Sequence, residues 1–352
     1  MSLKQNHKSG NKRLIVALSA LLIVGSVGLV LYFSSQQGVP SLWRCRQVPA
    51  AGKARGSIQE QKRIIEAIYQ ETQALQNEEL AKVKPGDFSD GLAIMDTDGH
   101  NWRLKYIWDY FLPAYNCPLK EKIGIDRQLG DSGKWLCGVR SLLQKDNCVV
   151  YSFGFNGEEA AFEQDLLRKT KCDVHVFDPT LSPAAQERFS GIKGVTLHNF
   201  GLGVKDGLVE LTDSRQNMRE GHTSFPVKSL ATITKELHHE WVDVMKVDIE
   251  GTEWGVLKDL VAKKTVLPFT QLQVEYHYFH ESNITVPRQM LDVLKGLTAR
   301  DMRVFNVEPN YWWANWAQEF MEFAYIQVNK HGEVVTGPQT ASRKIGGFQS
   351  AI

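Results

Sequence analysis

The chain has 352 residues, of which 23% are charged and 43% are hydrophobic, and its formal net charge is +1. This length allows one large domain or two small ones, and the hydrophobic share is enough for a sizeable core. The near-neutral charge gives no reason to expect a polyanionic partner, so we expect no binding to nucleic acid.

An uncharged, mostly apolar run extends from Leu14 to Phe33. A helix of about 20 residues spans the ~30 Å hydrocarbon core of a bilayer. Basic residues in the segment 1–13 place the N-terminus in the cytosol by the positive-inside tendency. We therefore expect a cytosolic tail over 1–13, a transmembrane signal-anchor over 14–33 and a type II orientation. The rest of the chain would then be lumenal, in the Golgi or endoplasmic reticulum, or secreted if a cleavable signal is the correct alternative.

Cysteine usage is compatible with that compartment. The five cysteines are Cys45, Cys117, Cys137, Cys148 and Cys172. The last four can form two disulfides in an oxidising lumen, and the first can bridge two chains of a homodimer. Buried free thiols are the alternative. The sequon Asn283-Ile284-Thr285 predicts a glycoprotein, since it is usable on the lumenal side.

The first part of the exported region has little regular pattern. Residues 34–56 mix Gln, Gly, Pro, Ser and basic residues, which indicates a stalk. From Ser57 to about Lys84 apolar residues recur among charges, and Glu60 follows Ser57 by three positions. This pattern predicts an amphipathic helix capped by Ser57, which we expect to pack on the domain rather than to dimerise. The whole stretch 57–146 is expected to be a helical and irregular lead-in that covers one side of the fold.

Residues 147–330 alternate between short apolar runs and helical segments. Strands are expected at 149–153, 174–178, 195–200, 242–249, 272–279, 302–308 and 323–328, and a short extended piece at 208–211. Helices are expected at 157–169, 182–190, 230–239, 253–263 and 288–298. Apolar strands alternating with helices indicate an α/β fold with a parallel sheet covered on both faces. The last two strands have no helix between them, which predicts a reversed strand at the edge. Residues 331–352 would be a C-terminal tail.

Two strand ends predict a nucleoside site. The first strand is followed by Gly154-Phe155-Asn156-Gly157, where glycines let the backbone approach a ligand closely. The second strand ends at Asp178, the position from which a carboxylate binds ribose hydroxyls in Rossmann-like folds. The chain lacks a Gly-x-Gly-x-x-Gly cradle for a pyrophosphate. A nucleoside without phosphates fits better, and S-adenosylmethionine is the abundant one.

Two later strand ends carry candidate catalytic groups. Asp248 and Glu250 follow the fourth strand, and Glu275 and His277 lie on one face at the end of the fifth. His277 can act as a general base because an imidazole titrates near neutral pH; a hydrogen-bonded structural histidine is the alternative. The four side chains can also hold a divalent metal ion, but we expect no resident metal.

The segments YSFGFNG, FDPT, NFGLG, VDVMKVDIEGTEWGVLKDL and VEYH, in that order, resemble the FkbM-type methyltransferases. With the N-terminal anchor and the WLCG segment, the chain is most similar to a membrane-anchored group within that family. The resemblance covers about residues 100–330. It implies a class I, Rossmann-like fold with a seven-stranded sheet, S-adenosylmethionine as donor, and an oxygen acceptor.

Carried over by position, the resemblance assigns the donor-binding residues. Gly154, Asn156 and Gly157 would line the methionine end of the donor, and Asp178 would hold the ribose. The adenine would lie near the segment Phe200, Gly201 and Leu202. The acceptor, a glycan, a peptide or a small molecule, is not identified by the resemblance.

One departure from the family pattern keeps other functions open. The family's first strand usually ends in an Asp that orients the donor's ammonium group, where this chain has Ser152. Glu158 or Glu159 can partly substitute for that carboxylate. A catalytically inactive binding or scaffold protein is therefore one alternative. A glycosyltransferase is another, because Asp96-Thr97-Asp98 resembles a metal-binding Asp-x-Asp, although its surroundings are typical of a turn.

Overall fold

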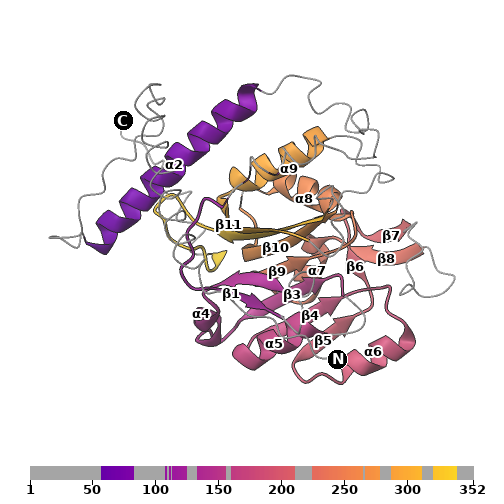
Figure 1. Cartoon of the computed structure of the whole chain (residues 1–352). Coiled ribbons are helices and arrows are strands. Elements are labelled where there is room, and N and C mark those ends of the chain that lie inside the picture. The colour runs from indigo at the N-terminus through magenta and orange to yellow at the C-terminus, as the bar shows by residue number, and fades with distance from the viewer. Residues whose placement is uncertain are drawn as a thin grey trace, which may run out of the picture. The chain divides into compact units, whose positions relative to one another are not determined.

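The computed structural model describes residues 57–82, 108, 111, 113–124, 133–155, 160–210, 224–264, 266–277, 287–310 and 320–338 (Figure 1). The expected span Leu14–Phe33, the stalk, Asp96-Thr97-Asp98 and the sequon at Asn283 lie outside these residues. Within the described ranges, no helix combines the length and the apolar character needed to cross a membrane.

A seven-stranded sheet forms the centre of the fold. Its strands are β3 (Val149–Phe153), β4 (Asp173–Phe177), β5 (Val195–His198), β9 (Val242–Val247), β10 (Phe269–His277), β11 (Met302–Pro309) and β12 (Phe320–Gln327). Their order across the sheet is β11-β12-β10-β9-β3-β4-β5. All neighbours pair in parallel except β12, which is antiparallel to both β10 and β11. The expected Rossmann-like, mostly parallel sheet is confirmed.

The position of the reversed strand differs from the expectation. β12 runs opposite to the other strands, but it lies between β10 and β11, so that β11 forms the edge. Seven of the eight residues of β12 are buried, whereas the last three residues of β11 are partly exposed. A strand that is apolar on both faces gains more from an interior place than from an edge. The apolar sequence of β12 is therefore the physical reason for its insertion.

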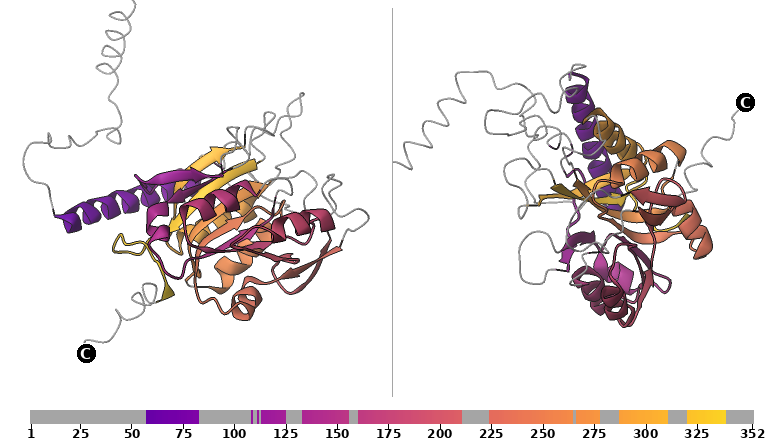
Figure 2. Two further views of the ribbon diagram at one scale, coloured as in Figure 1. Left: turned by 90° about the horizontal axis from the view of Figure 1, so that it is seen from below. Right: turned by 90° about the vertical axis from the view of Figure 1, so that its right-hand side faces the viewer.

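Helices cover both faces of the sheet (Figures 1 and 2). They are α4 (Val139–Leu143), α5 (Ala161–Lys169), α6 (Pro183–Ser190), α7 (Leu230–Glu236), α8 (Glu253–Lys263) and α9 (Pro287–Thr298). Tyr151 and Phe153 of β3 pack with the apolar residues of α7, α8 and α9. Val150 packs on the opposite face with α4 and α5. Because successive strand residues point to opposite faces, one apolar strand serves both layers.

The long helix α2 (Ile58–Lys82) packs on the edge strand β11, as expected. Ser57 Oγ accepts a hydrogen bond from the Glu60 N–H group at 3.3 Å, which confirms the predicted cap. Arg303 of β11 is 2% exposed, and its guanidinium lies 3.7 Å from the centre of the Tyr69 ring. The same guanidinium donates to Glu66 at 2.7 Å. These contacts attach α2 to the domain.

The lead-in contains regular structure that the sequence did not predict. Strands β1 (Lys120–Ile123) and β2 (Lys134–Cys137) form an antiparallel hairpin, whose end is tied by a disulfide between Cys117 and Cys137. Gln271 of β10 exchanges two hydrogen bonds with the Cys137 backbone, at 2.8 and 2.9 Å, which fixes the hairpin on the sheet. Strands of four residues that carry charged side chains are too short for an alternation of apolar and polar residues to be recognised.

A second small sheet was also missed in part. It has the order β6-β8-β7, with β6 at Gly201–Leu202, β7 at Gly207–Glu210 and β8 at Ser224–Lys228. Only β7 was expected. β8 is the middle strand of this sheet, and its Pro226 lies opposite Leu208 of β7. A proline within a run argues against a central strand, so the sequence pattern pointed away from this one.

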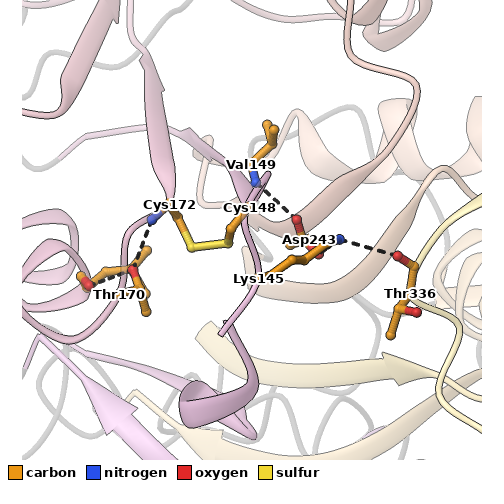
Figure 3. The surroundings of a disulfide bond; sticks show 8 residues. Lys145, Cys148, Val149, Thr170, Cys172, Asp243 and Thr336 are labelled. Atoms are coloured by element: carbon orange, nitrogen blue, oxygen red, sulfur yellow. Dashed lines mark hydrogen bonds and ion pairs between the residues drawn. A yellow bond between two sulfur atoms is a disulfide. The ribbon is translucent and has the colours of Figure 1, made fainter. Parts of the chain in front are cut away.

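The amino ends of three central strands are tied together at the sheet edge opposite the glycine turn (Figure 3). A disulfide joins Cys148, just before β3, to Cys172, just before β4. Asp243 of β9 accepts the Val149 N–H group at 3.0 Å and binds Lys145 at 2.5 Å. This edge is held covalently and by charge, which leaves the carboxyl ends of the same strands for a ligand.

Candidate functional site

The site is centred where the strand order reverses, between β3 and β9. Gly154 follows β3 with φ +75°, and a Cβ atom there would lie 1.5 Å from the Asp248 carbonyl oxygen. The Asp248 N–H group donates to the Phe153 carbonyl at 3.0 Å. Only glycine permits this contact and this backbone conformation. In open α/β sheets, such a reversal at the carboxyl edge is where ligands bind.

Asp178, expected to bind ribose, also has a structural role that the sequence did not reveal. Its Oδ2 accepts the Phe155 N–H group at 2.9 Å, and its Oδ1 accepts both the N–H and the hydroxyl of Thr180, at 2.7 and 2.6 Å. The side chain is almost fully buried, and burial raises its pKa despite these hydrogen bonds. Asp178 thus joins the glycine turn to the end of β4. A carboxylate has about four acceptor positions, so three protein bonds leave room for one more.

The segment expected near adenine lies beside Asp178. A Cβ atom at Gly201 would lie 3.3 Å from Pro179, and the Phe200 ring packs 5.6 Å from the Phe177 ring between centres. The Lys228 ammonium lies 4.4 Å from the centre of the same Phe200 ring. Leu202, in contrast, is 3% exposed and belongs to the core. Asn156 and Gly157, like Glu158 and Glu159, lie outside the described residues.

A buried carboxylate lies beside Ser152, the position at which the family usually has Asp. Ser152 is fully buried and donates to Glu163 Oε1 of α5 at 2.5 Å. Glu163 is itself 3% exposed. The negative charge that the strand lacks is thus present on the next helix. A carboxylate nine residues after Gly154, on the buried face of an expected helix, was the signal available in the sequence.

The four expected catalytic side chains do come together. The Nε2 atom of His277 lies 3.5 Å from Glu250 Oε2, 3.7 Å from Asp248 Oδ1 and 4.0 Å from Glu275 Oε1. On the other side of the ring, Nδ1 lies 3.3 Å from Glu253 Oε1, which also accepts the His277 N–H group at 2.8 Å. Glu253 begins α8 and is fully buried. The imidazole is therefore surrounded by carboxylates.

A lysine from the lead-in completes this cluster. Lys134 of β2 is 4% exposed, and its ammonium binds Glu322 of β12, Glu275 at 3.2 Å and Asp248 at 3.3 Å. Lys246 of β9 lies 3.7 Å from Asp248 and donates to the Gly154 carbonyl at 2.6 Å. Lys246 thus connects the Gly154 turn to the cluster around His277. Neither lysine stood out in the sequence, because the first lies in a short hairpin and the second inside an apolar strand.

The charges of the cluster shift one another. Burial alone would lower the pKa of His277, but Glu253, Glu275 and Asp248 raise the pKa to about 10. Burial would raise the pKa of Asp248, but Lys134 and Lys246 hold that pKa well below its ordinary value. Glu322 behaves in the opposite way, because its burial raises its pKa strongly. At neutral pH the imidazole is therefore a cation among carboxylates.

Comparison with known proteins points to one family. A family model described as "Methyltransferase domain" matches residues 68–327. Two curated relatives share the name "Probable methyltransferase-like protein 24". The protein from Homo sapiens is 25% identical over 170 residues, which cover 47% of this chain and 43% of the relative. The protein from Rattus norvegicus is 25% identical over 202 residues, which cover 53% of each chain. The chain thus spans about half the length of these relatives.

Two solved structures illustrate the likeness in arrangement. A methyltransferase FkbM from Methylobacillus flagellatus KT is 15% identical, with 53% of this chain and 46% of that chain covered and a TM-score of 0.34. Aeropyrum pernix fibrillarin, in complex with natively bound S-adenosyl-L-methionine, is 8% identical, with 59% and 88% covered and a TM-score of 0.29. At these TM-scores the likeness is a distant one.

Proposed function

The chain belongs to the methyltransferase-domain family, and on that premise we propose that it transfers a methyl group from S-adenosylmethionine to an oxygen of a lumenal or extracellular acceptor. The observation that carries the proposal is the site at the strand reversal. There the Gly154 turn, Asp178 and the cluster around His277 follow neighbouring strands.

The donor is assigned from shape and charge. Gly154 lets the turn after β3 pack directly against the Asp248 backbone at the carboxyl edge of the sheet, where such folds bind ligands. S-adenosylmethionine carries a positive sulfonium and a positive ammonium group, and a site rich in carboxylates favours such a ligand. Glu163 supplies the negative charge that the family's strand carboxylate would supply. These features support a donor-binding site and disfavour the inactive alternative.

The chemistry asked of the protein is mainly alignment. Methyl transfer from a sulfonium needs donor and acceptor in line and water excluded, which positioning alone accelerates strongly. Asp248 and Glu250 are the groups placed to accept a hydrogen bond from an acceptor hydroxyl, because both face the centre of the cluster. The base role expected for His277 requires that the imidazole first lose the proton that its neighbours stabilise.

The compartment is proposed from the cysteines. Two disulfides, Cys117–Cys137 and Cys148–Cys172, support an oxidising environment such as the secretory lumen. The apolar run Leu14–Phe33 supports a membrane anchor on the N-terminal side. The acceptor is accordingly sought among lumenal glycans, peptides and small molecules.

The direct test is calorimetric titration of the purified full-length chain with S-adenosylmethionine. We expect saturable binding at micromolar donor, weakened at least tenfold by Asp178→Asn, because the variant removes the charge that faces the ribose. Asp178 also supports the glycine turn, so circular dichroism must show the variant folded.

Phe200→Ala provides a second variant for the same titration. Its half-buried ring is expected to face the adenine, and its removal should weaken donor binding without disturbing the turn. If the folded wild-type chain binds no donor at millimolar concentration, the enzyme hypothesis is wrong and a scaffold function takes its place.

A further inference from the structure

We propose that Asp248, Glu250 and His277 bind one divalent transition-metal ion, of the Mn²⁺ kind, at the catalytic end of the site. One ligand atom from each of the three side chains lies within 4.8 Å of the others. His277 Nε2 is 3.7 Å from Asp248 Oδ1 and 3.5 Å from Glu250 Oε2. Neighbouring ligand atoms at bond lengths of about 2.1 Å on an octahedral ion such as Mn²⁺ are roughly 3.0 Å apart. The observed spacing is wider than this, so the three side chains would close around an ion by about half an ångström or more.

The orientation of His277 is the second observation that points to a metal. Its Nδ1 atom lies 3.3 Å from the buried carboxylate of Glu253, which directs Nε2 toward Asp248 and Glu250. Glu253 is held in turn by the Gly251 N–H group, at 2.9 Å from its Oε2. Metal-binding histidines characteristically place the other ring nitrogen against a carboxylate in this way, which fixes the tautomer and the ring. Without the Glu253 carboxylate at Nδ1, the three side chains would be an acidic cluster and no more.

The charge of the cluster favours a cation. The carboxylates that lie around His277 and Lys134 belong to Asp248, Glu250, Glu253, Glu275 and Glu322. Among the described residues, the cations in contact with this group are Lys134, Lys246 and the imidazolium of His277, fewer than the carboxylates. A metal ligand must be deprotonated, so an ion bound at Nε2 would displace the proton of the imidazolium and put a divalent charge in its place among these carboxylates. The lysines approach Asp248 at Oδ2, whereas Oδ1 faces His277.

The site is open to solvent on one side. The Glu250 side chain is 46% exposed and that of Asp248 is 23% exposed, whereas that of His277 is 5% exposed. An ion can therefore enter past Glu250 and reach a fixed imidazole. One nitrogen and two carboxylate ligands suit Mn²⁺ among the common divalent ions. The open coordination positions would hold an acceptor oxygen and lower the pKa of its hydroxyl. This role rests on the proposed function, but the binding of the ion does not.

The test measures metal binding without any donor. MnCl₂ is titrated into the metal-free full-length chain, and free Mn²⁺ is followed by electron paramagnetic resonance. We expect one ion per chain and at least tenfold weaker binding by Glu250→Gln, whose exposed side chain can change without disturbing the fold. Glu236→Gln, at an exposed carboxylate of α7 paired with Lys228, is the matched control and should bind like the wild type. Absence of saturable binding, or equal affinities for wild type and Glu250→Gln, would overturn the proposal.

A second variant and a second ligand separate this proposal from the enzymatic one. His277→Gln, shown folded by circular dichroism, should lose Mn²⁺ binding while donor binding in excess chelator is retained. Wild-type chain that binds S-adenosylmethionine but no Mn²⁺ contradicts the metal site and leaves the methyltransferase proposal intact. Wild-type chain that binds Mn²⁺ but no donor contradicts the methyltransferase proposal and leaves the metal site intact.

Discussion

At the scale of single residues, the pair Ser152 and Glu163 shows how one carboxylate can replace another. The family usually has a carboxylate at the end of the first strand, where this chain has Ser152. Here the buried carboxylate of Glu163 accepts a hydrogen bond from the Ser152 hydroxyl instead. A charge acts over several ångströms in a buried environment. Whether the carboxylate lies on a helix or on a strand therefore matters less than whether a carboxylate is present. We interpret Glu163 as a positioning residue for the donor's ammonium group.

This interpretation predicts the behaviour of Glu163→Gln. The amide still accepts the Ser152 hydrogen bond, so the fold should be retained, but the charge is lost. We expect S-adenosylmethionine to bind roughly three- to tenfold more weakly, about 1 kcal/mol, as measured by calorimetry. Glu187→Gln, at an exposed carboxylate of α6, should leave the affinity unchanged. Equal affinities for Glu163→Gln and the wild type would show that the pair is only a packing element.

The residues of the site differ in how far the sequence could predict them. Asp248, Glu250, Glu275 and His277 could be grouped because parallel strands place their carboxyl ends at one edge and because strand residues alternate. Lys134 could not, since its contact with Glu275 joins positions 141 residues apart through a hairpin. The structural use of Asp178 was equally hidden, because it depends on backbone N–H groups, which every residue except proline carries.

At the scale of elements, β4 and β5 carry a histidine cluster away from the catalytic groups. His175 Nδ1 lies 3.0 Å from His198 Nε2, and the Tyr151 hydroxyl lies 2.8 Å from His239 Nδ1. The His175 ring also packs edge-on against Tyr151 and His239. Burial, followed by the neighbouring histidines, lowers the pKa of His175 to about 4. These strands therefore place neutral imidazoles in the layer between sheet and α7.

The cluster predicts a loss of stability in acid. The folded chain keeps His175 neutral, while the unfolded chain binds a proton at an ordinary pKa of 6.5. The contribution of His175 is therefore full above pH 6.5 and is lost as the pH falls toward 4. With allowance for solvent screening, we expect roughly 1–2 kcal/mol. In denaturant unfolding, the free energy of unfolding of His175→Phe should fall less between pH 6.5 and 4 than that of the wild type. The free energy of unfolding of the exposed His331→Phe should fall as much as that of the wild type. Parallel curves for all three proteins would contradict this account.

Among the elements, those with a long or strongly apolar pattern were predictable. β3, β4 and α8 begin and end within one residue of the expected positions, because apolar runs mark them. The hairpin β1–β2 and strand β8 were not, since short polar strands are stabilised by partners distant in the sequence. The inserted place of β12 depends on competition between strands for burial, which no single segment reveals.

At the scale of the whole molecule, the two disulfides hold regions on which the site depends. Cys117–Cys137 fastens the hairpin that delivers Lys134 to the carboxylates. Cys148–Cys172 joins β3 and β4 at their amino ends, and the two strands pair in parallel from there to Phe153 and Phe177. The covalent links thus stabilise the arrangement of the site without taking part in it. Their formation also depends on the compartment in which the chain folds.

The pairing of the cysteines makes a joint prediction about oxidation and stability. Four of the five cysteines are paired, so the denatured, unreduced full-length chain from the secretory pathway should expose at most one thiol to a colorimetric reagent. The Cys148–Cys172 disulfide closes a loop with a sequence separation of 24, which restricts the unfolded chain. The double variant Cys148→Ala, Cys172→Ala should therefore lower the free energy of unfolding by about 3 kcal/mol. The wild type in reductant should lose at least as much, and Cys45→Ala should lose nothing. If four or five thiols react in the unreduced chain, the disulfides are absent in the cell, and the proposed lumenal placement loses the support that the cysteines give it.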